Sequence, residues 1–143
     1  MLPGNIYSGD KQRACFTNPT ELAFRKGTLD KHYPIEIDGL NFDDAETAYK
    51  YYTHEKRDDF EFCKYTCQRV LEYKLNQYPE LLKIIKESGG LQWIERCYHY
   101  TYARTSRFKR WEGQGRKSAF IDCLYKAYDA VWIEVLEKEK VNI

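Results

Sequence analysis

The segment 110–118, RWEGQGRKS, combines the side chains that an anion-binding loop needs. An indole supplies a flat apolar face, two glycines let the backbone approach a ligand closely, and two cations precede a hydroxyl that can cap a helix. The capped helix would direct free N–H groups at an anion. The candidate ligand-binding residues are Trp111, Gly113, Gly115, Arg116, Lys117 and Ser118. An ordinary glycine loop before a core helix explains the same pattern equally well.

The same segment is not a P-loop nucleotide-binding motif. That motif has glycine directly before its Lys-Ser pair and follows a strand, whereas Arg116 occupies the glycine position here. Hydrolysis of a nucleoside triphosphate by that route is therefore not expected. The preceding residues 97–110 mix aromatic rings with cations such as Arg104, Arg107 and Arg110. This mixture suits a phosphate-bearing or single-stranded partner, and a solvated loop would show it too.

Two carboxylates, Glu46 and Glu112, are candidates for acid–base catalysis. Glu112 follows Trp111 directly. Glu46 falls in the first turn of a predicted helix, where a carboxylate also complements the helix dipole and can close a capping box with Asp43. The sequence contains no nucleophile-elbow pattern, so a Ser–His–acid or Cys–His triad is not expected.

The five cysteines predict reduced structural thiols rather than disulfides or a metal centre. Cys63 and Cys67 lie four residues apart, so on a helix they share a face and resemble half of a metal site. The other Cys and His residues supply no second paired spacing, which favours buried thiols and predicts no metal. The sequence shows no leader of signal-peptide type and no apolar run of about 18 residues, so we expect a cytoplasmic protein that does not act on membranes.

Length and composition predict one compact domain over residues 1–143. Hydrophobic residues make up 43% of the chain and charged residues 31%, which is typical of a folded protein with a real core. The formal net charge of +1 excludes a strong overall attraction to nucleic acid or anionic lipid, so electrostatic recognition must be local. The 13 tyrosines suit either core packing or a pocket for flat polar rings.

The hydrophobic pattern predicts a mainly α fold with a few short β-strands near the N-terminus. Ile35 and Ile37 alternate with acids before an Asp38-Gly39 turn, as in a short strand. Apolar spacing predicts helices at 42–54, 58–78, 80–87 and 117–140. The first of these would be capped by Asp43 or Asp44. Residues 3–34 are expected to form short strands or a wrapped loop. Strands and helices do not alternate along the sequence, so a parallel sheet is not expected.

Four segments, in this order, resemble the NADAR family, also called YbiA-like. Its members are small, mainly helical N-glycosidases and ADP-ribose-processing proteins. Ile6-Tyr7 followed by Cys15-Phe16-Thr17-Asn18 is similar to the aromatic stretch and Phe-Ser-Asn signature of the family. Residues 34–39 with Glu46-Thr47-Ala48-Tyr49 resemble its strand, turn and Glu-containing helix. Residues 78–95 resemble its "His-Pro-x-Leu … Leu-Val-Glu" segment, and 111–124 its Trp-Gly-Asp, glycine-rich, helix-opening end.

The resemblance implies one YbiA-like domain that cleaves an N-glycosidic bond at ribose C1, without metal or cofactor. The substrate would be ADP-ribose on guanine bases of nucleic acid or nucleotides, or a related ribosyl-phosphate compound. Glu46 would be the catalytic carboxylate and Glu112 the alternative. The implied substrate contacts are stacking by Phe16, Tyr49 and Trp111, a sugar hydrogen bond from Asn18, and phosphate neutralisation by Arg116, Lys117 and the helix start near Ser118. Lys50, Gly113 and Gly115 are further substrate-binding candidates.

Departures from the family pattern leave other functions open. Thr53 stands where the family has a Lys seven residues beyond the Glu, and Glu112 follows Trp111 directly where the family has Gly-Asp. A divergent, phage-encoded member, located in the host cytoplasm, could be an inactive module that binds ADP-ribose, or one that binds nucleic acid through residues 104–116. A third possibility is a protein that binds and inhibits a host factor.

Overall fold

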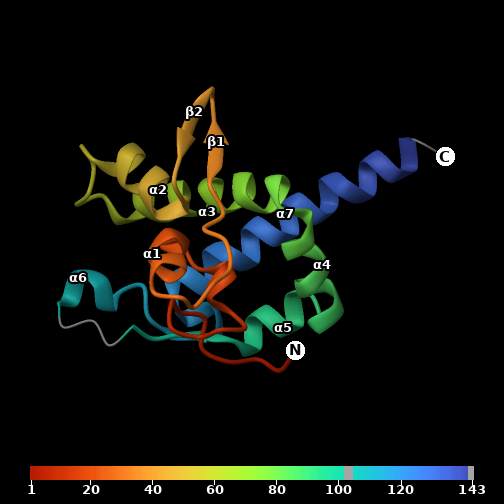
Figure 1. The fold of residues 1–143 in the computed structure, drawn as a ribbon, viewed down its shortest axis with the longest axis horizontal. Helices are drawn as coiled ribbons and strands as arrows, with labels where there is room; N and C mark the ends of the chain where they lie inside the picture. The colour runs from red at the N-terminus through yellow and green to blue at the C-terminus, as the bar shows by residue number, and fades with distance from the viewer. Residues whose placement is uncertain (102–104, 142–143) are drawn as a thin grey trace.

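Two long helices, α3 (Phe60–Gln77) and α7 (Ala119–Val141), pack against each other at the centre of the fold (Figure 1). The computed structural model describes residues 1–101 and 105–141 and is mostly helical, with a few short strands. The other helices are α1 (Thr20–Arg25), α2 (Ala45–Thr53), α4 (Pro79–Ser88), α5 (Leu91–Arg96) and α6 (Ser106–Lys109), with 3-10 turns η1 (Ala14–Phe16) and η2 (Gly115–Lys117). Arg104 and the side chain of Arg107 lie outside the described part.

Local capping explains where the principal helices begin. The Asp44 carboxylate accepts a hydrogen bond from the Thr47 amide at 2.8 Å and starts α2, which confirms an Asp cap. Asp59 caps α3 in the same way through the Phe62 amide, at 3.0 Å. Because Thr47, and not Glu46, occupies the third helical position, the predicted capping box between Asp43 and Glu46 is wrong.

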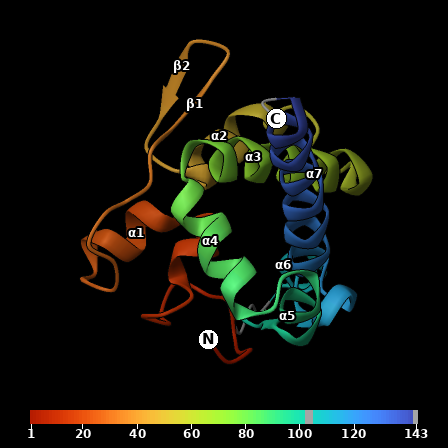
Figure 2. The same ribbon diagram turned by 90° about the vertical axis from the view of Figure 1, so that its right-hand side faces the viewer.

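Four short strands form two separate antiparallel pairs. β1 (Ile35–Ile37) and β2 (Leu40–Phe42) form a hairpin that projects from the body of the molecule (Figure 2). Phe42 therefore ends a strand, and the helix predicted at 42–54 begins only at Ala45. β3 (Tyr98–His99) pairs with β4 (Gly113–Gln114), and Asn5 forms a bridge to Tyr98. The strands are thus not confined to the N-terminal region, because the second pair closes a loop between distant segments.

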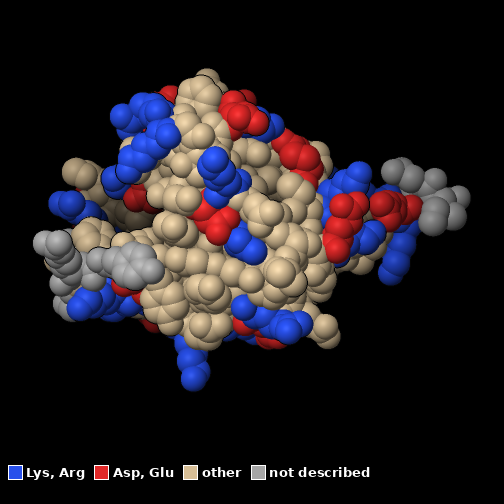
Figure 3. All heavy atoms as spheres, turned by 60° about the horizontal axis from the view of Figure 1, so that its bottom comes forward, with Lys and Arg blue, Asp and Glu red and all other residues tan. Residues whose placement is uncertain are grey.

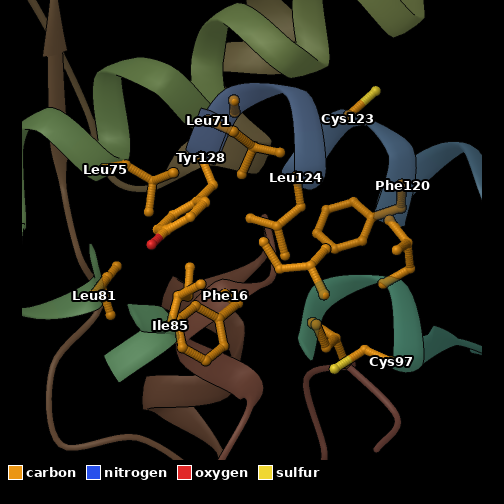
Figure 4. Close-up of a cluster of buried hydrophobic side chains, with 14 of the residues drawn as sticks. Phe16, Leu71, Leu75, Leu81, Ile85, Cys97, Phe120, Cys123, Leu124 and Tyr128 are labelled. Carbon is orange, nitrogen blue, oxygen red and sulfur yellow. The ribbon is translucent and has the colours of Figure 1, made fainter. Parts of the chain in front are cut away.

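The core fills the space between α3, α7 and the N-terminal loop. Figure 4 shows side chains from α3, α4 and α7 converging with the Phe16 ring. Phe16 is 1% exposed and packs edge-on against Trp93, with 5.7 Å between ring centroids. The prediction that Phe16 stacks on a substrate is therefore wrong, since its ring is enclosed by the core.

Within residues 1–101 and 105–141, no helix combines the length and the apolarity that a membrane span requires.

Candidate active site

A cavity of about 710 Å³ opens between the loop after η1, helix α2, the start of α3 and the segments around β3 and α6. Figure 3 shows a hollow on this side of the molecule with Lys and Arg side chains around it. The cavity brings together five of the residues predicted from sequence: Asn18, Glu46, Tyr49, Lys50 and Trp111. These residues come from three segments that are distant in the chain.

The lining residues differ in how far they are buried, and we name three groups on that basis. The buried group, called the floor, comprises Thr17, Asn18, Thr53, Cys63, Cys67 and Phe120. Half-buried residues form the wall and include Glu46, Tyr49, Phe60, His99 and Trp111. The exposed residues form the mouth and are Lys50, His54, Arg57, Thr101, Phe108 and Arg110. A ligand that fits these layers carries polar groups inward, a flat ring along the wall and negative charge at the mouth.

A backbone hydrogen bond links Asn18, in the floor of the cavity, to Glu46. The Asn18 carbonyl accepts hydrogen bonds from the amides of Thr20, at 2.9 Å, and Glu46, at 3.0 Å. The second bond satisfies one of the free N–H groups at the start of α2. Lys74 is 1% exposed, and its Nζ donates to the Thr17 carbonyl at 2.6 Å. This bond anchors the loop after η1 to α3.

The Asn18 side chain is buried but incompletely paired. Its Nδ2 donates to the Cys67 Sγ at 3.5 Å. Its Oδ1 is buried and accepts no hydrogen bond from the described part of the chain. An unpaired buried acceptor is costly, so any donor that reached Oδ1 would be favoured there.

Glu46 has the environment of an acid–base group. Burial raises the pKa of its carboxyl above 4.5; the Lys50 charge opposes this shift, and the Asp44 charge adds to it. The Lys50 Nζ lies 3.9 Å from the Glu46 Oε1, so the pair is loose and the carboxylate stays available to the cavity. Raised carboxyl pKa values in clefts are typical of catalytic acids and bases.

Aromatic rings build one wall of the cavity. The Trp111 indole packs edge-on against Tyr49 and against Phe60, with centroid distances of 5.8 and 5.5 Å. The Arg110 guanidinium lies 4.3 Å from the Phe60 centroid. This chain of contacts holds Trp111 at the wall, where a flat ligand ring could pack against it.

The cations predicted to bind phosphate point elsewhere. The Arg116 Nε donates to the Asp122 Oδ1 at 2.7 Å, and its guanidinium lies 3.9 Å from the Tyr125 centroid. Lys117 is exposed and does not line the cavity. The prediction for both residues is wrong because the η2 turn directs them away from it. Lys50, Arg57 and Arg110 are instead the cations of the described lining, and Glu46 is its acid.

The glycine loop and Ser118 have structural roles. The Ser118 Oγ accepts from the Ile121 amide at 3.2 Å and so caps α7 as predicted, but it is buried and donates to the Trp111 carbonyl. Gly115 has a φ of +55°, and a Cβ there would lie 2.5 Å from the Glu95 carbonyl oxygen. Gly113 pairs with His99 in the β3–β4 ladder. None of these three residues lines the cavity, so their predicted ligand contacts are wrong.

Glu112 lies beside the cavity rather than in its lining. Its Oε2 accepts hydrogen bonds from the backbone amide and the hydroxyl of Thr101. Thr101 does line the cavity. This arrangement gives Glu112 a role in holding the 99–101 segment, and it leaves Glu46 as the carboxylate of the lining.

The lining residues that sequence reasoning missed include Arg57 and His99. Arg57 lies in the turn between α2 and α3, and His99 lies in β3, where it faces the cavity only because β3 pairs with β4. No local signal marks either residue. All five cysteines are free and buried, as expected of structural thiols. Among the residues that the structure describes, no group of His, Cys, Asp and Glu has the arrangement of a metal site.

Comparisons of the chain with protein-family models, with curated proteins and with solved structures find no match. Any function assigned to the cavity therefore depends on its own chemistry and on the resemblance noted in the sequence.

Proposed function

We propose that the cavity is the active site of an N-glycosidase that acts at ribose C1, and that the chain is a divergent NADAR (YbiA-like) domain. The preferred substrate is ADP-ribose attached to a guanine base of nucleic acid or a nucleotide, with related ribosyl-phosphate compounds as the wider class. The observation that carries this proposal is that Asn18, Glu46 and Trp111 line one cavity. In the family resemblance, Asn18 would bind the sugar, Glu46 would act at the reacting carbon and Trp111 would stack on the base.

The proposed reaction needs few groups. As the bond from C1 to the base nitrogen breaks, its electron pair leaves with the base and positive charge develops on the sugar. The Glu46 carboxylate stabilises that charge and takes a proton from the water that attacks C1. The same proton then passes to the departing base, so the hydrolysis balances without another reactant.

The layered lining supports one orientation of the substrate. The sugar would lie near the floor, where the Asn18 Oδ1 can accept from a hydroxyl, and the base would lie along the Trp111 wall. The phosphates would lie at the mouth, near Lys50, Arg57 and Arg110, in place of the cations predicted in the glycine loop. A phosphate that continues into a nucleic-acid chain would then extend into solvent.

The direct test is Glu46→Gln, which keeps the size of the side chain and removes its charge. Release of ADP-ribose from guanosine-modified DNA and RNA should fall by roughly 10²- to 10⁴-fold. Glu61→Gln, on an exposed side chain of α3, is the matched control and should leave turnover unchanged. Undiminished turnover by the Glu46 variant would overturn the catalytic assignment.

A module that binds ADP-ribose without cleaving it is the second candidate. The observation that favours it is Thr53, which stands at the position of the family Lys and is buried with its hydroxyl donating to the Tyr49 carbonyl. In that case the wild type should bind ADP-ribose tightly and release nothing from modified guanosine. The same assay thus separates the two functions.

A further inference from the structure

His99 presents a hydrogen-bond acceptor of fixed orientation to the cavity. Its Nδ1 lies 2.6 Å from the Ile6 carbonyl oxygen. A carbonyl oxygen can only accept, so the hydrogen must be on Nδ1, and in the neutral ring Nε2 carries a lone pair.

The surroundings of the imidazole keep it in place. β3 pairs with β4, and the Ile6 amide donates to the Tyr98 carbonyl at 2.9 Å, so the strand is held from both sides. The His99 ring also packs on Phe120, with 4.7 Å between centroids and 35° between planes. Both rings line the cavity. Within the described part of the chain, Nε2 has no hydrogen-bond partner.

Burial of His99 favours the neutral form of its ring. Burial lowers the pKa of His99 below 6.5, although the Ile6 hydrogen bond and the charge of Glu112 oppose the shift. Glu112, just before β4, is the charged group that acts on the imidazole from the described residues. With its hydrogen on Nδ1, the neutral imidazole accepts a hydrogen bond at Nε2.

We propose that His99 is a specificity-determining residue, whose Nε2 accepts a hydrogen bond from a ring N–H of the nucleobase held against the Trp111 wall. The cavity then selects bases with a lactam or imide N–H, such as guanine, over the same bases with that nitrogen methylated. The ligand class rests on the proposed function, since that supplies the nucleobase. The acceptor itself does not depend on catalysis.

The selection follows from the cost of leaving an acceptor unpaired once a bound ligand has excluded water from it. Two acceptors of the cavity, Asn18 Oδ1 and His99 Nε2, lack partners in the described residues. A sugar hydroxyl can satisfy the first and a ring N–H the second. A methyl group in place of that hydrogen leaves Nε2 desolvated and unpaired, which corresponds to roughly a tenfold to hundredfold loss of affinity.

The first experiment requires no ligand. Two-bond ¹⁵N–¹H correlation spectra of the full chain at pH 7.5 should show His99 as the neutral tautomer with hydrogen on Nδ1. A His99 that carries its hydrogen on Nε2, or that is protonated at this pH, overturns the proposal.

The second experiment measures binding by calorimetry with guanosine 5′-monophosphate and its N1-methyl derivative. The wild type should bind the unmethylated nucleotide about ten- to a hundredfold more tightly. In His99→Asn the amide nitrogen can still donate to the Ile6 carbonyl, while the acceptor at Nε2 is lost, so the variant should fold normally and bind both nucleotides equally. Equal binding by the wild type, a preference retained by His99→Asn, or binding of neither nucleotide overturns the proposal.

Failure of the proposed function would look different. A wild type that prefers the unmethylated nucleotide but releases no ADP-ribose from modified guanosine retains this inference and loses the N-glycosidase assignment. A wild type that releases ADP-ribose without the preference loses only the role of His99.

Discussion

The backbone carbonyl of Asn18 accepts a hydrogen bond from the Glu46 amide at 3.0 Å, which fastens the N-terminal loop to the first turn of α2. The contact joins residues far apart in the sequence. Both residues line the same cavity.

Replacing Asn18 with Ala should reduce turnover far more than stability. The variant keeps the backbone bond to Glu46 and loses only the side chain, whose one hydrogen bond is a weak one to the Cys67 sulfur at 3.5 Å. Loss of a substrate hydrogen bond at the floor should lower kcat/KM by about tenfold to a hundredfold. Steady-state kinetics and thermal unfolding check this. Asn76→Ala, on the exposed face of α3, is the control, and an Asn18 variant as active as that control would remove Asn18 from the site.

Removing the cations of the mouth should weaken binding of phosphate-bearing ligands. The double variant Arg57→Gln, Arg110→Gln should bind ADP-ribose about tenfold or more less tightly, and its affinity should depend less steeply on salt. Calorimetry at several salt concentrations measures both effects. Arg116→Gln is the contrast, because its guanidinium pairs with Asp122 and lies outside the lining. If Arg116→Gln weakens binding as much as the double variant does, the phosphates do not lie at the mouth.

The pH profile should report the Glu46 carboxyl. The charged form is the working form, so kcat/KM should be full above the pKa of Glu46 and fall as the pH drops through it. Burial raises that pKa, and the Lys50 charge lowers it in part. The acid limb should therefore lie above pH 4.5, and Lys50→Met should move it to higher pH while Lys50→Arg leaves it in place. If the acid limb of the kcat/KM profile lies at the same pH in Lys50→Met as in the wild type, a group other than Glu46 titrates there.

Lys74 should make a measurable contribution to the pH dependence of stability. Burial lowers the pKa of its ammonium group from 10.5 to about 8. Between those values the unfolded chain binds the proton that the folded chain has released, so this contribution to stability rises with pH from about 8 to 10.5, by up to roughly 3 kcal/mol.

Other groups oppose this trend, so the test compares variants. Burial raises the pKa of Cys15 to about 11 and that of Tyr33 to about 12. Each of these groups lowers the free energy of unfolding as the pH rises, because the folded chain keeps a proton that the unfolded chain releases. The difference in unfolding free energy between the wild type and Lys74→Met, measured by urea denaturation, should increase across this window. Lys83→Met, at an exposed side chain of α4, should show no such increase. A constant difference for Lys74→Met would mean that Lys74 keeps an ordinary pKa in the folded chain.

The sequence by itself determined the four longest helices, because their signals are local, but it missed the short helices α1, α5 and α6. Asp44 and Asp59 cap the helices that follow them, and Pro79 opens α4 while Gly89, with a φ of +133°, ends it. Each of these effects acts within one turn of the chain, so composition and spacing suffice. The start of α2 was predicted three residues too early. Phe42 pairs with Ile35 in the β1–β2 hairpin, and a local helix pattern does not reveal that pairing.

Only the tertiary structure decided which side chains meet. Arg116 was predicted to bind phosphate and Arg57 was not, yet Arg116 pairs with Asp122 while Arg57 and Arg110 line the cavity. His99 reaches the cavity through a strand pairing with Gly113 and a hydrogen bond to Ile6, which no local pattern encodes. The direction of a side chain and the burial of a lysine such as Lys74 depend on packing between distant segments, and that packing is settled only when the whole chain folds.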